Sequence, residues 1–318
     1  ILGVLIFGAG ASLIVTNLSP FATMFEKAFG LTGVVPVDEA VIAALIDEVA
    51  EIGRMTSFIL LFGFLINILL ARITPFKYIF LTGHMMWIMA GALSWAFYDL
   101  GVSETNGIIF GSIIQGIVLV TLPAISQPII KKLIGNDNIA YGHLTTTGVV
   151  ASAYIGKLFG NKEKDSEKIQ VPEKLEFFKD TAISVSLIMV VIYLITAIFA
   201  GPEIVESLSK GQNYIVFSLL SALGFAAGIL ILLQGVRMFL GEIIPAFRGI
   251  ALKIVPGAKP ALDVPVFFPY SPNALMLGFI FAILGMIVGM FVSTLFGTVV
   301  PLPSIIGAFF TGGIAGIF

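Results

Sequence analysis

Long runs of apolar residues, separated by short polar stretches, dominate the hydropathy pattern of this chain. Runs of roughly 18 or more apolar residues are typical of helices that cross a membrane, and they are too long for the strands of a membrane barrel. The pattern therefore predicts an all-α, multi-pass membrane protein with about eight spans. These spans are expected at residues 1–16, 57–73, 78–98, 107–130, 181–200, 214–236, 272–296 and 299–318.

Two further apolar segments, 139–160 and 241–270, are interrupted by glycine or proline. Such segments suit re-entrant hairpins, amphipathic surface helices or broken helices that are buried in protein. The chain starts without methionine and ends within an apolar run, so it is expected to be a fragment that is truncated at both ends.

The positions of lysine and arginine predict the orientation, because basic residues gather in cytoplasmic loops. Placing loop 72–77, segment 131–179 and stretch 237–259 in the cytoplasm puts 14 of the 17 basic residues inside. The loop 17–56 is acidic and falls outside. With these regions inside, the predicted spans alternate in direction without any change to their bounds, so this is the predicted topology.

An internal repeat is suggested by segments 3–38 and 228–263, which align without gaps. An odd number of predicted spans separates the two copies, so the second copy is expected to be inverted. Inverted repeats with broken helices are typical of secondary transporters, although a duplicated scaffold in a channel or assembly factor is the alternative. The predicted repeats cover about 1–180 and 181–318, and the matched residues are Gly3 with Gly228, Gly10 with Gly235, Pro20 with Pro245 and Asp38 with Asp263.

The amino-acid composition limits the kinds of reaction and binding site that this chain can provide. The chain is 58% hydrophobic and only 11% charged, and it has no cysteine and two histidines. Disulfides, thiolate catalysis and cysteine metal sites are therefore excluded, and two histidines leave little for a metal cage. We expect no cofactor, no resident metal and no nucleic-acid partner. Nucleotide-binding, zinc and Ser-His-Asp motifs are absent, so this chain is not expected to hydrolyse a nucleotide itself.

Each of the two histidines follows a glycine. His84 lies in "LTGHMMWIM", inside the predicted span 78–98, and His143 opens the interrupted segment 139–160 in "AYGHLTTTG". An ionisable side chain at membrane depth is costly unless it is paired or hydrated, so it indicates a functional site. The alternatives are a neutral His84 bonded to a helix carbonyl and a His143 at the cytoplasmic interface.

Three more residues complete the predicted substrate site. Asp263, in "KPALDVPVFFPYSPN", is flanked by prolines that prevent a plain helix, and its carboxylate can accept hydrogen bonds from sugar hydroxyls or act as a base. Thr145 belongs to a patch of hydroxyls after His143, and Gln115 lies within a span. The alternatives are a helix cap for Asp263 and Thr145 and a contact between helices for Gln115. The charged loop 161–180 is expected to be solvated, or else to dock a cytoplasmic partner.

Four stretches carry a family resemblance that covers essentially the whole chain. They are "FLTGHMM", "YGHLTTTGVVASAYIGKLFGNKEKDSEKIQVPEKLEFFKDTAIS", "QGVRMFLGEIIPAFRGIALKIVPGAKPALDVPVFFPYSPNA" and "FFTGGIAGIF". They resemble the IIC membrane component of the bacterial ascorbate-type phosphotransferase system. The resemblance implies inverted repeats that form a core domain and a V-shaped scaffold domain, with a homodimer joined through the scaffold.

The resemblance also implies the function and the partners. It implies a sugar permease in the bacterial cytoplasmic membrane, with phosphorylation of a sugar or sugar acid by a partner IIB that carries a phosphocysteine and is served by IIA. The matching site residues are His84, His143 and Asp263. Ile88 and Leu144 stand where ascorbate-transporting members carry amides, which leaves the sugar open between ascorbate and a relative. A proton-coupled secondary transporter and a non-transporting sugar sensor are the alternative functions.

Overall fold

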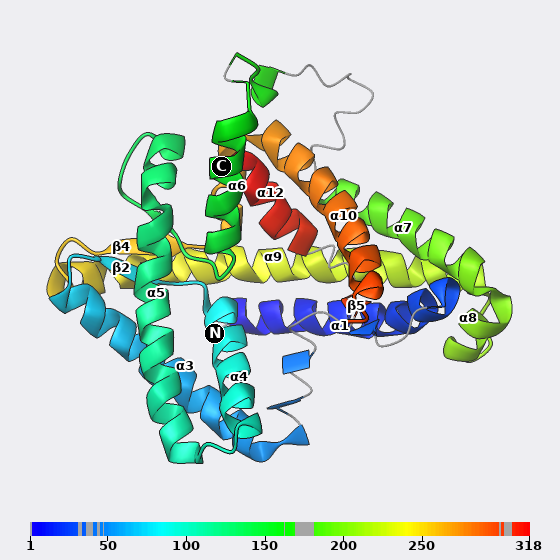
Figure 1. The fold of residues 1–318 in the computed structure, drawn as a ribbon, viewed down its shortest axis with the longest axis horizontal. Coiled ribbons are helices and arrows are strands. Elements are labelled where there is room, and N and C mark those ends of the chain that lie inside the picture. Colours follow the sequence, from blue (N-terminus) through cyan, green and yellow to red (C-terminus); the bar gives the residue numbers. More distant parts are fainter. Residues whose placement is uncertain are drawn as a thin grey trace. The chain divides into compact units, whose positions relative to one another are not determined.

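The structure is a computed structural model whose ribbon is drawn in Figure 1. It is mostly helical, as the hydropathy pattern predicts, but five short strands lie among its described residues. The predicted helical class is confirmed, and the strands are only two to four residues long. The described residues are 2–30, 34–35, 41–42, 45–46, 48–161, 163–168, 181–298, 300–301 and 307–318.

The chain forms two compact units, and neither is one continuous stretch of sequence. The first unit comprises Ile1–Val37, Gln170–Ile243 and Ile283–Ile306, and the second comprises Asp38–Ile169, Ile244–Ala282 and Gly307–Phe318. Each unit thus combines residues from before and after position 180. Two helices, α9 (Tyr214–Lys253) and α10 (Pro272–Leu295), contribute residues to both units.

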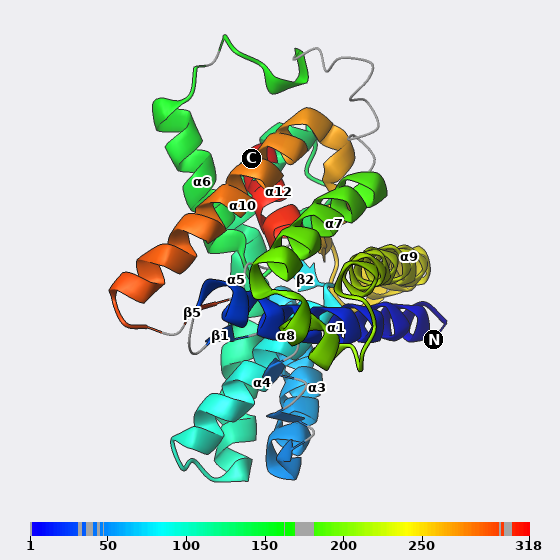
Figure 2. The ribbon, with the colours of Figure 1, turned by 90° about the vertical axis from the view of Figure 1, so that its right-hand side faces the viewer.

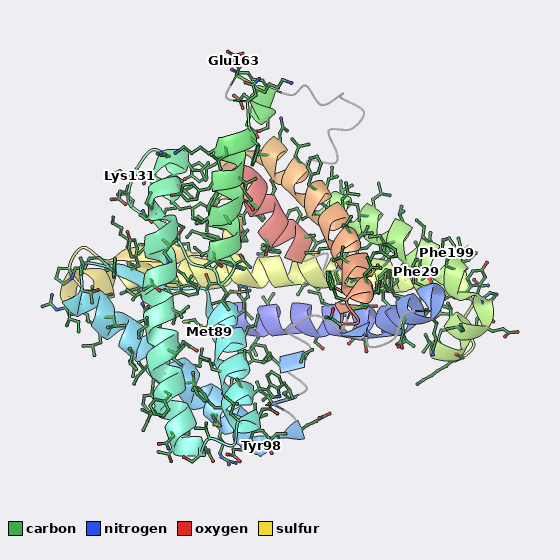
Figure 3. The ribbon with its side chains drawn as sticks, viewed as in Figure 1. Phe29, Met89, Tyr98, Lys131, Glu163 and Phe199 are labelled. Atoms are coloured by element: carbon green, nitrogen blue, oxygen red, sulfur yellow. The ribbon has the colours of Figure 1, made fainter. Side chains whose placement is uncertain are left out.

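In the first unit, α1 (Leu2–Phe29) packs against α7 (Thr181–Ala200) and against the short α8 (Pro202–Leu208). The buried Tyr193 hydroxyl donates to the carbonyl of Asn17 at 2.7 Å, and its ring lies 4.6 Å from that of Phe21. Figure 3 shows Phe29 beside Phe199, with the ring centroids 5.8 Å apart. Two parallel two-residue strands, β1 (Val34–Val35) and β5 (Val300–Pro301), also pair in this unit.

In the second unit, α3 (Ala50–Ile73), α4 (Gly83–Asp99) and α5 (Glu104–Ile134) pack along one another, as Figures 1 and 2 show. Small residues allow α3 and α5 to approach closely, because Gly63, Gly111 and Gly116 all lie directly against side chains of the facing helix. Helices α6 (Thr146–Phe159) and α12 (Gly313–Ile317) also belong to this unit, with a π-helical turn at Ala308–Gly312.

The close contact at Gly116 predicts a loss of stability when this residue becomes alanine. A Cβ there would lie 2.3 Å from Ile66 Cγ2 and 3.2 Å from the carbonyl oxygen of Gly63, so the helices must separate. We expect Gly116→Ala to lower the free energy of unfolding by about 1–3 kcal/mol, measured as a lower Tm in detergent. Gly148→Ala on α6 is the matched control, since no described atom lies within 4 Å of the added carbon. Equal Tm changes in both variants would contradict the prediction.

A three-stranded parallel sheet in the second unit is the feature that the hydropathy pattern did not predict. Its order is β2 (Tyr78–Phe80), β4 (Lys259–Leu262) and β3 (Ala140–Tyr141), with β4 in the middle. Predicted span 78–98 therefore starts as a strand and becomes helical only at Gly83. Strands this short have no detectable period in the sequence, and their partners lie far away along the chain.

Several predicted boundaries also change. Segment 139–160 is interrupted as predicted, with β3 followed by a turn and then α6. Segment 241–270 begins as helix, because α9 continues to Lys253 before β4 and two 3-10 turns, Val264–Val266 and Phe268–Tyr270. Predicted span 299–318 contains β5, the π-helical turn and α12, while its residues 299 and 302–306 lie outside the described residues.

Three helices are long and apolar enough to cross a membrane, namely α3, α5 and residues 273–295 of α10. Residues 186–200 of α7 and α8 make a fourth candidate if the two, bent by 114°, form one broken span. These helices agree with a membrane protein. The number of eight spans stays a prediction, because these candidates come from the described residues only.

The described part of the loop after α6 is held by hydrogen bonds to the start of α10. The Glu167 carboxylate accepts hydrogen bonds from the backbone N–H groups of Asn273 and Ala274, which open α10. The Asn273 side chain in turn donates to the carbonyl of Ser166 at 3.1 Å. A carboxylate at the first N–H groups of a helix is a favourable cap, so this part of the predicted loop 161–180 is packed against the helix start. Residues 169–180 of the loop lie outside the described residues.

Candidate functional site

The three-stranded sheet brings together the three residues that the sequence singled out. The strands are parallel, and Phe80, Ala261 and Ala140 lie side by side in one row. His84, Asp263 and His143 follow these strands, so all three come from the carboxyl edge of the sheet. Ligands bind at the carboxyl ends of parallel strands in many soluble proteins, because several loops meet there.

The ligand-forming atoms of His84, His143 and Asp263 all lie within 4.8 Å of one another. The imidazole rings of the two histidines have centroids 6.2 Å apart, and His84 Nδ1 lies 3.9 Å from Asp263 Oδ2. Asp263 and His143 are only 4% and 3% exposed, whereas His84 is partly accessible. A distance of 3.9 Å is too long for a hydrogen bond between His84 Nδ1 and Asp263 Oδ2.

The Asp263 carboxylate is oriented by its own backbone. Its Oδ1 atom accepts a hydrogen bond of 2.8 Å from the N–H of Val264, which starts the 3-10 turn. The predicted capping role is thus present, and it occupies one carboxylate oxygen. The other oxygen, Oδ2, is the one that faces His84.

Thr145 contacts His143 at the Nδ1 atom of the imidazole ring. Its hydroxyl lies 2.7 Å from this nitrogen, and its backbone N–H donates to the same atom at 3.3 Å. A backbone N–H can only donate, so in the neutral imidazole Nδ1 is the acceptor and Nε2 carries the proton. The Tyr141 hydroxyl also bonds to the Thr145 hydroxyl, and its ring stacks on His143 with centroids 5.9 Å apart. Thr145 therefore acts as a positioning residue for His143.

Two helices begin next to the site. Helix α4 starts at Gly83 and α6 starts at Thr146, and neither has a side-chain cap at its first residue. The uncapped N–H groups of a helix start carry partial positive charge and favour anionic groups. The partial positive charge of these helix starts offsets part of the negative charge of the buried Asp263 carboxylate.

The glycines of the two Gly-His pairs lie in different surroundings. A Cβ on Gly142 would lie 2.6 Å from the carbonyl oxygen of Ala261, so glycine is needed for β3 to pair with β4. The Gly142 N–H donates to Leu262 at 2.8 Å, and its carbonyl accepts from the Thr82 hydroxyl. At Gly83, in contrast, no described atom lies within 4 Å of an added Cβ. Thr82 is the residue at this edge that sequence reasoning missed, since a threonine before Gly-His has no distinctive signal.

Gln115 lies in the contact between α3 and α5, against Gly63. Its side chain is fully buried, and its two amide atoms have no hydrogen-bond partner among the described residues. Gln127 and Asn273, two further amides in predicted spans 107–130 and 272–296, bond to Asp137 and to the loop at Glu167. The predicted site residues thus divide into three that converge, one that positions His143, and Gln115 between two helices.

An apolar cluster lies next to these polar groups. Ile88 packs with Phe80, Met85 and Leu119, and Leu144 packs against the same cluster. Both residues at the positions where the resemblance expects amides therefore face apolar neighbours, and neither adds a hydrogen bond to the site.

Comparison with known proteins assigns the family. The sequence profile of EIIC-GAT, described as the sugar-specific permease component of the PTS system, matches residues 1–318. A relative from Mycoplasma pneumoniae (strain ATCC 29342 / M129), named ascorbate-specific PTS system EIIC component, is 27% identical over 370 aligned residues. The alignment includes all of this chain and 56% of the relative, so the chain spans about half of the relative's length. Because the profile covers the whole chain, this protein belongs to the EIIC-GAT family of sugar-specific permease components of the phosphotransferase system.

Proposed function

We propose that this protein is the sugar-binding membrane subunit of a bacterial phosphotransferase system, which takes up ascorbate or a related sugar acid as a partner IIB phosphorylates it. The observation that carries the proposal is the convergence of His84, His143 and Asp263 at the carboxyl edge of the sheet. The whole chain lies within the sugar-permease family, which supports the transport class.

The three side chains suit a small polyol. The Nε2–H of neutral His143 donates to a substrate oxygen, while Asp263 Oδ2 accepts from a hydroxyl. A hydrogen bond to a charged group contributes about 1.5–3 kcal/mol, so the carboxylate is the strongest single contact available. The adjacent starts of α4 and α6 offset part of the negative charge of Asp263, so the site suits a sugar or a sugar acid.

The phosphoryl group is supplied by another chain. Residues 1–318 contain no cysteine and no nucleotide-binding motif, and in this proposal the phosphocysteine belongs to a IIB component that IIA reloads. In the transfer, a substrate hydroxyl oxygen bonds to phosphorus as the sulfur–phosphorus bond of IIB breaks. The hydroxyl proton passes to the His84–Asp263 pair, whose facing atoms are 3.9 Å apart. IIB leaves with its thiolate, and the phosphorylated sugar is released into the cytoplasm.

The architecture proposed for this activity is an inverted repeat with a core and a V-shaped scaffold, in a homodimer joined through the scaffold. The order helix, strand, helix, strand occurs twice, as α1, β1, α3, β2 and as α9, β4, α10, β5. With the offset that aligns Gly3 with Gly228, β1 and β4 begin at matching positions. The pairing supports the repeat further, since β1 pairs with β5 and β4 pairs with β2, each time across the two copies. Asp38, the repeat partner of Asp263, lies outside the described residues.

The test uses the full-length protein in proteoliposomes with radiolabelled ascorbate on the outside. With phosphorylated IIB enclosed, we expect labelled ascorbate phosphate to accumulate in the lumen. Without IIB, we expect binding and no accumulation. Uptake of unmodified ascorbate that requires a proton gradient and no IIB would contradict the proposal and would favour the secondary transporter. A negative result with ascorbate and a positive one with another sugar acid would change only the substrate.

A further inference from the structure

We infer that His84, His143 and Asp263 also form a binding site for a divalent transition-metal cation, Zn²⁺ in particular. The nitrogen and oxygen atoms that these residues offer lie within 4.8 Å of one another. Two imidazoles and one carboxylate are a donor set that binds zinc and leaves a fourth position open. The cation and the substrate would use the same atoms, so each would exclude the other. Metal binding itself does not depend on the proposed transport function.

The present distances are close to those of a metal centre. With zinc–ligand bonds of about 2.0–2.1 Å, two ligands of a tetrahedral site are roughly 3.3 Å apart. The Nδ1 atom of His84 lies 3.9 Å from Asp263 Oδ2, and the largest separation in the cluster is at most 4.8 Å. Small side-chain rotations are therefore enough to close the cluster, without movement of the strands that carry it.

The neighbouring groups fit such a centre as well. A ligating histidine donates its other ring N–H to an acceptor, and a ligating carboxylate is held through its second oxygen. The Thr145 hydroxyl lies 2.7 Å from His143 Nδ1, where it can accept that proton once Nε2 binds the cation. The N–H of Val264 already holds Asp263 Oδ1, which leaves Oδ2 for the metal. In the metal-bound state the Thr145 hydroxyl would accept the Nδ1 proton, and the hydrogen bond from the Thr145 N–H, which needs an unprotonated Nδ1, would be lost.

Composition makes this inference easy to test. Residues 1–318 contain no cysteine and no histidine besides these two, so within them every imidazole or thiolate ligand of the type that zinc prefers is in this cluster. A cation bound through oxygen alone elsewhere would have the selectivity of Mg²⁺ or Ca²⁺. Selectivity for Zn²⁺ and Co²⁺ over Mg²⁺ that is lost when both histidines are replaced therefore reports on this site.

The experiment titrates Co²⁺ into the full-length, chelator-stripped protein in detergent and records the visible ligand-field absorption. We expect one Co²⁺ per chain with an intense tetrahedral spectrum, displaced by Zn²⁺ and not by Mg²⁺. His84→Gln and His143→Gln should each weaken binding by about 100-fold or more, since loss of an outer hydrogen-bond partner alone costs about 10- to 100-fold. Thr145→Val, which keeps all three ligands, should weaken binding about 10-fold.

Asp137→Asn is the matched control, because this carboxylate lies at the other edge of the sheet with Lys259 and should leave Co²⁺ binding unchanged. Equal Co²⁺ affinity in the wild-type protein and in the double histidine variant would overturn the inference. So would a wild-type protein with no tetrahedral spectrum, a result that does not depend on whether any variant folds. The titration contains no sugar and no IIB, so failure of ascorbate uptake leaves its outcome unaffected.

Discussion

Replacing Asp263 by asparagine is expected to lower IIB-dependent uptake of ascorbate by about 100-fold, with little change in stability. Asparagine can still accept the hydrogen bond from Val264 and cap the 3-10 turn, so the backbone stays in place. The oxygen that faces His84 is replaced by an amide donor, and the negative charge is lost. A charge-assisted hydrogen bond is worth about 1.5–3 kcal/mol, which corresponds to roughly 10- to 150-fold, and loss of the proton acceptor adds to this.

Uptake rates in proteoliposomes and the Tm of each variant check this prediction. The matched control is Asp137→Asn, which removes a carboxylate bonded to Lys259 at 2.6 Å and to Gln127 at 2.7 Å. These hydrogen bonds hold the pKa of the Asp137 carboxyl below its usual range. Its contribution to stability is therefore present at neutral pH and is lost as the pH falls through that lowered pKa. Equal losses of uptake in the two variants would show that Asp263 acts on the fold and not on the substrate.

Substituting alanine for Gly142 is expected to reduce uptake by at least about 100-fold, although this residue has no functional side chain. The new Cβ would lie 2.6 Å from the oxygen and 2.8 Å from the carbon of the Ala261 carbonyl, both of them backbone atoms. No side-chain rotation relieves such a contact, so β3 must move away from β4. The hydrogen bond from Gly142 to Leu262 is then lost, and His143 is displaced from Asp263. A misplacement of about 1 Å can cost about 10²-fold in rate.

The second Gly-His pair provides the control for this prediction. Gly83→Ala changes the residue before His84 in the same way, but no described atom lies within 4 Å of the added carbon. We expect its uptake to stay within about threefold of the wild-type rate, because an open position tolerates a methyl group. Uptake of radiolabelled ascorbate and binding of ascorbate, measured on both variants, test this prediction. Loss of function in Gly83→Ala as large as in Gly142→Ala would mean that the strand contact is not the cause.

The amino-acid sequence by itself determined the class of protein and the chemistry available to it. Long apolar runs indicate membrane helices because lipid leaves the backbone no other way to pair its polar groups within a segment. The starts of α7 and α10 agree with the predicted spans for this reason. Two histidines and one acid in apolar surroundings stand out for a similar reason, since a titratable group is costly there. These are local properties, and a sequence window is enough to detect them.

Only the tertiary structure decided how these residues meet. The strands β2, β3 and β4 are two to four residues long and come from distant parts of the chain, so no periodicity reveals them or their partners. Their pairing places His84, His143 and Asp263 together, turns Thr145 towards His143, and makes glycine necessary at position 142 while leaving position 83 open. Hydropathy indicates which segments lie in the membrane, because it depends on the residues of one segment. Strand pairing depends instead on hydrogen bonds between segments that are far apart in the sequence.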